Sequence, residues 1–165
     1  MVKEVRLRTF EDSDSELMEN WLEKDYIIKW YLDAEDWLTE ISQRHEEYHW
    51  LNHFIVMSQE KAIGFCQYYD VFAAKDLEDW YHVKEPGKVF SIDYLIGEEE
   101  FLGKGYGKEI VRLLVDLIMA NEEKAEAIIV QPDKENAQSN GVLLANDFVY
   151  DEKRNTIKRI CALSE

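Results

Sequence analysis

Residues 102–107 read LGKGYG, and they follow an apolar run at residues 89–96 that reads VFSIDYLI. Three of the seven glycines of the chain lie between Gly103 and Gly107. Glycine allows a backbone to approach a ligand closely, and the start of a helix offers free N–H groups and the positive end of its dipole. The stretch therefore predicts a strand, an anion-binding turn and a helix. The same pattern also fits a flexible helix start that binds nothing.

Two other phosphate-binding motifs do not fit this stretch. A Walker loop requires Ser or Thr after Gly-Lys, but Gly107-Lys108 is followed by Glu109. The dinucleotide pattern Gly-x-Gly-x-x-Gly requires glycine at position 108, which is lysine. The turn is therefore neither of these motifs.

Hydrophobic periodicity on both sides of the turn predicts alternating strands and helices. Expected strands cover residues 3–8, 53–57, 62–69, 89–96 and 127–130; expected helices cover about 12–22, 34–45, 110–118 and 136–145; a closing hairpin is expected at 148–150 and 156–162. Residues 71–88 are irregular and predict a loop or a short helix near the site. The order predicts an α/β or α+β fold, a central mixed sheet with helices on both faces.

Length and charge limit the possible classes of protein. The 165 residues predict one domain, 1–165, and 46% apolar residues are enough for a core. A net charge of −16 disfavours nucleic acid and anionic membranes as partners and favours a small cationic molecule. With no apolar run long enough to span a bilayer and no signal-peptide pattern, we expect a cytoplasmic location. Monomer and homodimer both remain open.

Cysteine and histidine patterns give no strong metal signal. Cys66 and Cys161 lie far apart, so we expect two buried thiols rather than a disulfide or a cysteine-rich metal site. Residues 45–49 read HEEYH and match the zinc motif His-Glu-x-x-His. That motif needs a helix, however, and Trp50 and a strand follow almost at once. We therefore expect no metal, with a zinc peptidase as a distant alternative.

The glycine turn and the strand before it resemble the acetyl-CoA-binding motif of the GCN5-related N-acetyltransferases. Further stretches resemble the aminoglycoside 6′-N-acetyltransferase branch, namely residues 55–57 (IVM), 63–70 (IGFCQYYD) and 91–93 (SID), and Pro132 with Asn136. The similarity runs from Arg6 to about Phe148. Acetyltransferases that modify ribosomal proteins or siderophore amines share the same pattern.

This resemblance implies that acetyl-CoA is the co-substrate. Its pyrophosphate would lie on the backbone amides of Leu102, Gly103, Lys104, Gly105, Tyr106, Gly107 and Lys108. Its pantetheine would lie beside Leu95 and Ile96, where the fourth and fifth strands open, and Asn136 would contact it from the next helix. The chain departs from the family at two positions. Where this chain has Leu102, the family often has Arg or Gln. Where it has Leu143, the family often has a Tyr that protonates the leaving thiolate. The acidic run at residues 98–100 also opposes binding of an anion unless those side chains point to solvent.

The resemblance also assigns an acceptor side. Asp93 would fix the substrate ammonium and accept its proton, although an exposed polar residue on a half-buried strand would look the same. Five further residues would form an acidic and aromatic wall for the substrate, namely Asp70, Glu78, Asp79, Trp80 and Tyr81. The family places its first helices beside the acceptor, so Trp30, Tyr31, Asp33 or Glu35 are further candidates.

The sequence therefore predicts transfer of an acetyl group from acetyl-CoA to a primary amine of a cationic small molecule, with the 6′-amine of an aminoglycoside as the expected acceptor and antibiotic resistance as the associated role. The amine would attack the thioester directly, without a covalent enzyme intermediate. Two alternatives remain open: acetylation of a peptide amine such as that of a ribosomal protein, and a non-catalytic acyl-CoA-binding module.

Overall fold

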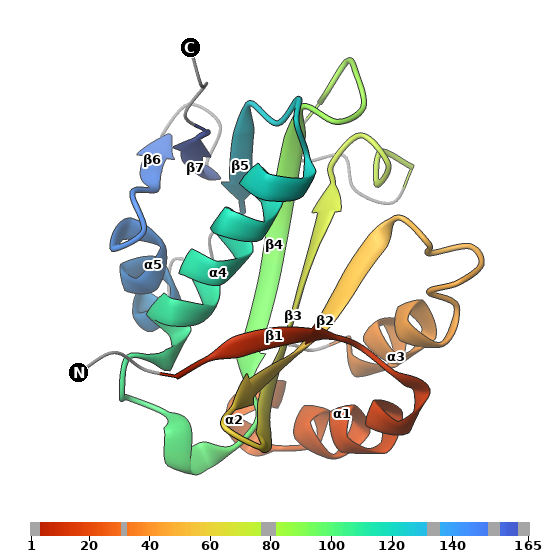
Figure 1. Ribbon diagram of the computed structural model, residues 1–165, viewed down its shortest axis with the longest axis vertical. Coiled ribbons are helices and arrows are strands. Elements are labelled where there is room, and N and C mark those ends of the chain that lie inside the picture. Colours follow the sequence, from red (N-terminus) through yellow and green to blue (C-terminus); the bar gives the residue numbers. More distant parts are fainter. Residues whose placement is uncertain (1–3, 31–32, 77–81, 132–135, 152–155, 162–165) are drawn as a thin grey trace. The chain divides into compact units, whose positions relative to one another are not determined.

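The computed structural model describes residues 4–30, 33–76, 82–131, 136–151 and 156–161 (Figure 1). The strands are β1 (Arg6–Thr9), β2 (Leu51–Ser58), β3 (Lys61–Asp70), β4 (Val89–Ile96), β5 (Ala127–Val130), β6 (Val149–Asp151) and β7 (Thr156–Ile160). The α-helices are α1 (Ser15–Leu22), α2 (Asp25–Ile28), α3 (Ala34–Ser42), α4 (Tyr106–Asn121) and α5 (Ala137–Leu144), and short 3-10 turns are η1 (Asp12–Asp14) and η2 (Glu99–Phe101).

The strands form one mixed sheet, as the sequence predicts. The strand order is β1-β2-β3-β4-β5-β7-β6. Strand β1 pairs with β2 antiparallel, β4 pairs with β5 parallel, and β7 pairs antiparallel with both β5 and β6. A parallel pair requires a crossover connection, which here contains α4.

The chain divides into two compact units. The first comprises residues 1–67 and 94–110 and the second residues 68–93 and 111–165, so that β3, β4 and α4 each contribute to both. The core of the first unit is a cluster of aromatic and aliphatic side chains that includes Met18 and Trp21 of α1, Trp37 of α3, Phe65 of β3 and Leu95 of β4. Helices α1 and α3 are amphipathic, and each buries the apolar face from which the sequence predicts a helix.

In the second unit, α4 supplies Val111, Leu114 and Ile118 to the buried set, and β5 supplies Ile128 and Ile129. Strands β4 and β5 are paired only at the start of β4, where Val89 is the Cα partner of Ala127 and Phe90 that of Ile128. All four residues of β5 have Cα partners on β7, whereas only its first two are paired with β4. This register fits the expected opening between the fourth and fifth strands.

One helix ends earlier than predicted. The sequence predicts a helix to His45, but α3 ends at Ser42 and residues 43–50 form turns. Arg44 donates from Nη1 to the carbonyl of Ile41 at 2.8 Å and from Nη2 to Asp12 at 2.5 Å. The guanidinium thus satisfies a carbonyl of the last helical turn from outside the helix and stabilises its end.

Among the described residues, no helix has the length and apolar character needed to cross a membrane. Both cysteines are buried free thiols, as predicted.

Candidate functional site

The glycine turn has the geometry of an anion cradle. Gly103 and Gly105 have φ angles of +69° and +86°, a left-handed conformation that favours glycine. Helix α4 begins directly afterwards at Tyr106, so the first N–H groups of the helix have no partner within it. Residues 103–105 are exposed, and a Cβ added at Gly103 would meet nothing within 4 Å. The turn therefore offers backbone donors beside open space, which fits a pyrophosphate.

An aromatic pair joins the two ends of this turn. The rings of Phe101 and Tyr106 meet edge to face with centroids 5.1 Å apart. Such a pair contributes about 0.5–1.5 kcal/mol beyond the area it buries. The contact fixes residues 102–105 at both ends and so preorganises the turn.

Two carboxylates of the acidic run before the turn, Glu98 and Glu100, form contacts with other side chains. The indole N–H of Trp21 donates to the carboxylate of Glu98 at 2.6 Å, and Glu98 is half-buried. Lys61 forms an ion pair with Glu100. The hydrogen bond from Lys61 is the main reason that the pKa of Glu100 is lowered, with Lys104 and Lys24 contributing further. These cations offset the negative charge that would oppose an anion on the turn.

The end of β4 is fixed by side chains that the sequence analysis did not single out. Tyr26 donates its hydroxyl proton to the carbonyl of Ile96 at 2.9 Å, and Lys24 donates to the carbonyl of Gly97 at 2.6 Å. The side chain of Leu95 is buried in the core of the first unit. The carbonyl of Ile96 therefore already has a donor from the protein, a contact that the sequence does not predict.

The predicted contacts on α5 have structural roles of their own. Asn136 is the N-cap of α5, and its side-chain oxygen accepts from the N–H of Ser139 at 3.1 Å. Leu143 is 2% exposed, so its apolar side chain lies in the core and offers no proton to a leaving thiolate. Pro132 lies outside the described residues.

Of the predicted base and the five residues predicted to form a wall for the substrate, the structure describes Asp93 and Asp70. Asp93 is half-buried inside β4, three residues before the strand ends, and its role as base stays a prediction. Both carboxylate oxygens of Asp70 accept backbone N–H groups, from Phe72 at 2.9 Å and from Gly87 at 2.7 Å. Asp70 therefore closes the base of the loop that follows β3. Glu78, Asp79, Trp80 and Tyr81 lie outside the described residues, as does Tyr31.

The family model described as "Acetyltransferase (GNAT) domain" matches residues 11–156. The chain belongs to the GNAT family. As a member, it is an acetyl-CoA-dependent N-acetyltransferase, and its mixed sheet is the GNAT fold.

Relatives of this GNAT chain include an aminoglycoside branch. The aminoglycoside N(6′)-acetyltransferase type 1 of Klebsiella pneumoniae is 26% identical over 142 residues, which cover 82% of this chain and 69% of that protein. The structure of the aminoglycoside acetyltransferase AAC(6′)-Ib with coenzyme A and kanamycin is 23% identical, with a TM-score of 0.76 over 94% of each chain. Spermidine N-acetyltransferase from Vibrio cholerae, with CoA and spermine, is 16% identical, with a TM-score of 0.71 over 95% of each chain.

Neither cysteine of this GNAT chain has the character of a nucleophile. Burial raises the pKa of the Cys66 thiol far above its ordinary value, and burial also raises that of Cys161. A protonated, buried thiol does not attack a thioester. The predicted direct attack by the amine needs neither of them.

The His-Glu-x-x-His stretch lies in turns rather than on a helix, because α3 has already ended. His45 and His49 are exposed and line a pocket of about 250 Å³ with His53 and Arg44. Within the described ranges, no group of three or more His, Cys, Asp or Glu side chains could hold a metal ion. The motif therefore lacks the helical spacing that zinc binding requires.

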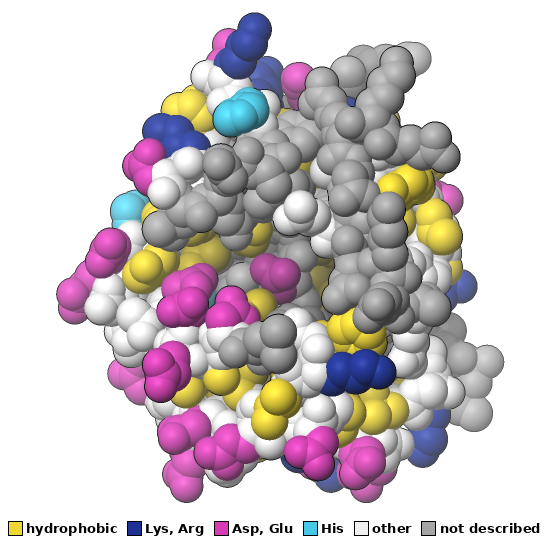
Figure 2. All heavy atoms as spheres, turned by 180° about the vertical axis from the view of Figure 1, so that it is seen from behind, with side chains coloured by type: hydrophobic (Ala, Val, Ile, Leu, Met, Phe, Trp, Pro, Cys, Tyr) yellow, Lys and Arg dark blue, Asp and Glu magenta, His cyan; other side chains and the backbone are white. Residues whose placement is uncertain are grey.

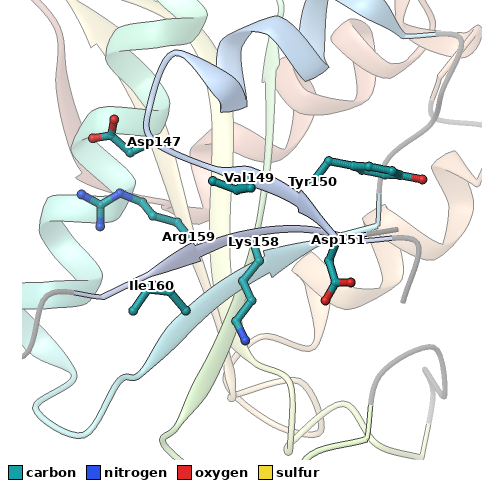
Figure 3. Close-up of a pocket in the computed structure, with 7 residues that line it drawn as sticks. All are labelled: Asp147, Val149, Tyr150, Asp151, Lys158, Arg159 and Ile160. Atoms are coloured by element: carbon teal, nitrogen blue, oxygen red, sulfur yellow. The ribbon is translucent and has the colours of Figure 1, made fainter. Parts of the chain in front are cut away.

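A second pocket, of about 560 Å³, lies on the C-terminal hairpin (Figure 3). It is lined by Asp147, Val149, Tyr150, Asp151, Lys158, Arg159 and Ile160. Figure 3 shows acidic side chains at Asp147 and Asp151 and basic side chains on β7 around it. None of these residues was predicted as a site residue, and the sequence gives no motif for them.

His53 predicts a loss of stability on acidification. It is 5% exposed on β2, and among the described residues neither of its ring nitrogens has a hydrogen-bond partner. Burial is the main reason that the pKa of His53 is lowered to about 4. The positive charge of Arg44 lowers this pKa further, whereas Gln67 acts to raise it. The unfolded chain, with a histidine pKa near about 6.5, binds a proton first as the pH falls. Between about pH 7.5 and about pH 5 the free energy of unfolding should therefore fall by about 2 kcal/mol.

Urea denaturation across this pH range measures the effect. The variant His53→Phe, which keeps a ring beside Phe10 and Phe65, should lose most of this pH dependence. The exposed His45 serves as the control, because His45→Phe should keep it. Equal pH dependence in the wild type and His53→Phe would show that His53 is not the buried titrating group.

Proposed function

We propose that this GNAT acetyltransferase acetylates a primary amine of a cationic small molecule, and that the 6′-amine of an aminoglycoside is its substrate. Its relatives by sequence include aminoglycoside N(6′)-acetyltransferases. The observation that carries the proposal is the charge of helices α1 to α3. Between residues 15 and 42 there are eight acidic residues against two lysines.

Seven of these eight carboxylates face solvent. Exposed members are Glu16, Glu19, Glu23, Asp25, Asp33, Glu35 and Asp36. Figure 2 shows acidic side chains gathered over the lower and left parts of its view, the side on which α1, α2 and α3 lie. The family resemblance assigns these helices to the acceptor, and a negative field raises the local concentration of a polycation.

The cofactor half of the proposal rests on the glycine turn. Backbone N–H groups of residues 102–108 would hold the pyrophosphate, with the start of α4 supplying the positive end of its dipole. The side chain of Asn136 caps α5, which leaves its amide nitrogen for a ligand. When bound, acetyl-CoA supplies an activated thioester.

Asp93 would do the acid–base work in this proposal. A carboxylate can bind the substrate ammonium and accept its proton, directly or through water, so that the neutral amine attacks. A backbone N–H of the β4 end would stabilise the charge that develops on the acetyl oxygen, because a preorganised donor needs no reorganisation during the reaction. With Leu143 buried, the leaving thiolate would take its proton from water or from another group.

A thiol-release assay tests the proposal. Purified protein with acetyl-CoA is offered an aminoglycoside, spermidine and a basic peptide in parallel. We expect the highest kcat/KM with the aminoglycoside and a KM for the amine that rises with salt, since ion pairs in an open site are screened over about 8 Å at physiological ionic strength. Turnover of the peptide with an inert aminoglycoside would refute the substrate, and no turnover of any amine would favour a non-catalytic module.

A further inference from the structure

The backbone at the end of β4 is held by the corner between α1 and α2. Tyr26 donates to the carbonyl of Ile96 at 2.9 Å, and Lys24 donates to the carbonyl of Gly97 at 2.6 Å. The N–H of Gly97 donates to the carbonyl of Ile63 at 2.8 Å. The peptide between Ile96 and Gly97 is therefore hydrogen-bonded at both its C=O and its N–H.

These contacts differ from those of an ordinary strand end. A carbonyl at the end of a strand usually bonds a neighbouring strand or water, and it then keeps some freedom. Here both donors are side chains from residues 70 and 73 positions earlier in the chain. The orientation of the Ile96 and Gly97 carbonyls therefore depends on side chains at the corner between α1 and α2.

The third member of the corner is Trp21, whose indole ring packs on Gly97. A Cβ at Gly97 would lie 2.1–2.3 Å from three indole carbons, so the ring and the backbone are in direct contact. Trp21 is 1% exposed, and its N–H donates to the carboxylate of Glu98 at 2.6 Å. The ring and its N–H fix the two residues that lead into η2 and the glycine turn.

We propose that Trp21, Lys24 and Tyr26 are positioning residues for the pantetheine arm of CoA, acting through the backbone of residues 96–98. This inference rests on the proposed cofactor site, because the end of β4 is where that arm would lie. By holding two carbonyls with side chains, the corner keeps the neighbouring backbone groups in one orientation before the ligand arrives. Preorganisation of this kind raises affinity because less is ordered on binding.

The test compares two ligands that share only part of their structure. CoA contains pantetheine, whereas adenosine 3′,5′-bisphosphate carries the nucleotide and lacks it. A residue that orients the pantetheine side should affect binding of CoA alone. A residue that merely stabilises the fold would affect both ligands or neither.

Calorimetric titration of Tyr26→Phe measures this difference, since the variant removes the hydroxyl and keeps the ring. We expect the Kd for CoA to rise about fivefold to tenfold, the size of one neutral hydrogen bond, while the Kd for the bisphosphate stays unchanged. The matched control is Tyr48→Phe, on the turn after α3, which should leave both values unchanged.

Lys24→Met provides a second variant, with Lys29→Met as its control of equal charge, because Lys29 is exposed at the opposite end of α2. Lys24→Met should again weaken CoA more than the bisphosphate, and Lys29→Met should affect neither. Wild-type affinity for CoA in both Tyr26→Phe and Lys24→Met, or equal losses for the two ligands, would overturn the inference. Wild-type protein that binds neither ligand would overturn the proposed cofactor site itself, and this inference with it.

Discussion

Gly105→Val is expected to weaken CoA binding by about 100-fold or more. Gly105 has a φ of +86°, which a β-branched residue adopts only at a high energetic cost. The variant must therefore change the path of the exposed turn, and its side chain would also block close approach of a ligand to the backbone N–H groups. Calorimetric titration with CoA measures the loss.

A second glycine provides the matched control for this substitution. Gly87 has a φ of +79°, and a Cβ there would meet nothing within 4 Å, so Gly87→Val introduces similar strain outside the turn. We expect it to lower thermal stability by a similar amount while CoA still binds with wild-type affinity. If folded Gly105→Val binds CoA as tightly as the wild type, residues 102–108 are not the pyrophosphate site.

Asp93→Asn is expected to lower kcat/KM for the amine by about 100-fold or more, while the Kd for CoA stays unchanged. The amide keeps the shape of the side chain but removes the negative charge and the ability to accept a proton. Loss of a base or a charge partner affects the acceptor, whereas the glycine turn remains intact. Steady-state kinetics with an aminoglycoside, together with CoA titration, separate these effects.

The control for this variant is Asp116→Asn. Asp116 is exposed on α4 and forms an ion pair with Arg112 at 3.1 Å, so the substitution makes the same chemical change away from the β4 end. It should leave kcat/KM unchanged. Near-normal activity of Asp93→Asn would assign proton transfer to another group or to water alone.

Much of the fold follows from local sequence patterns. Val89–Ile96 and Ala127–Val130 form strands with the predicted bounds, because each is a short apolar run between polar residues. The four-residue helix α2 was missed, because one turn is too short to show helical periodicity. The end of α3 was placed three residues too late, because the contacts of Arg44 that stabilise it leave no periodic signal.

The site shows a similar division. Gly103 and Gly105 could be found because a positive φ requires a particular residue type, which the sequence displays. The roles of Tyr26, Lys24 and Trp21 could not be found, because their contacts with residues 96–98 span between 70 and 77 positions of the chain. The charge of Asp70 predicts a contact with the substrate, whereas its hydrogen bond with the N–H of Gly87, 17 positions later, has no signal in the sequence.

The most direct test of the proposed activity identifies the product. Kanamycin is incubated with the protein and acetyl-CoA, and the product is analysed by mass spectrometry and NMR. We predict a single added acetyl group on the 6′ nitrogen, with one thiol released for each acetyl transferred. Unmodified kanamycin, in a preparation that acetylates a polyamine or a basic peptide under the same conditions, would contradict the proposal.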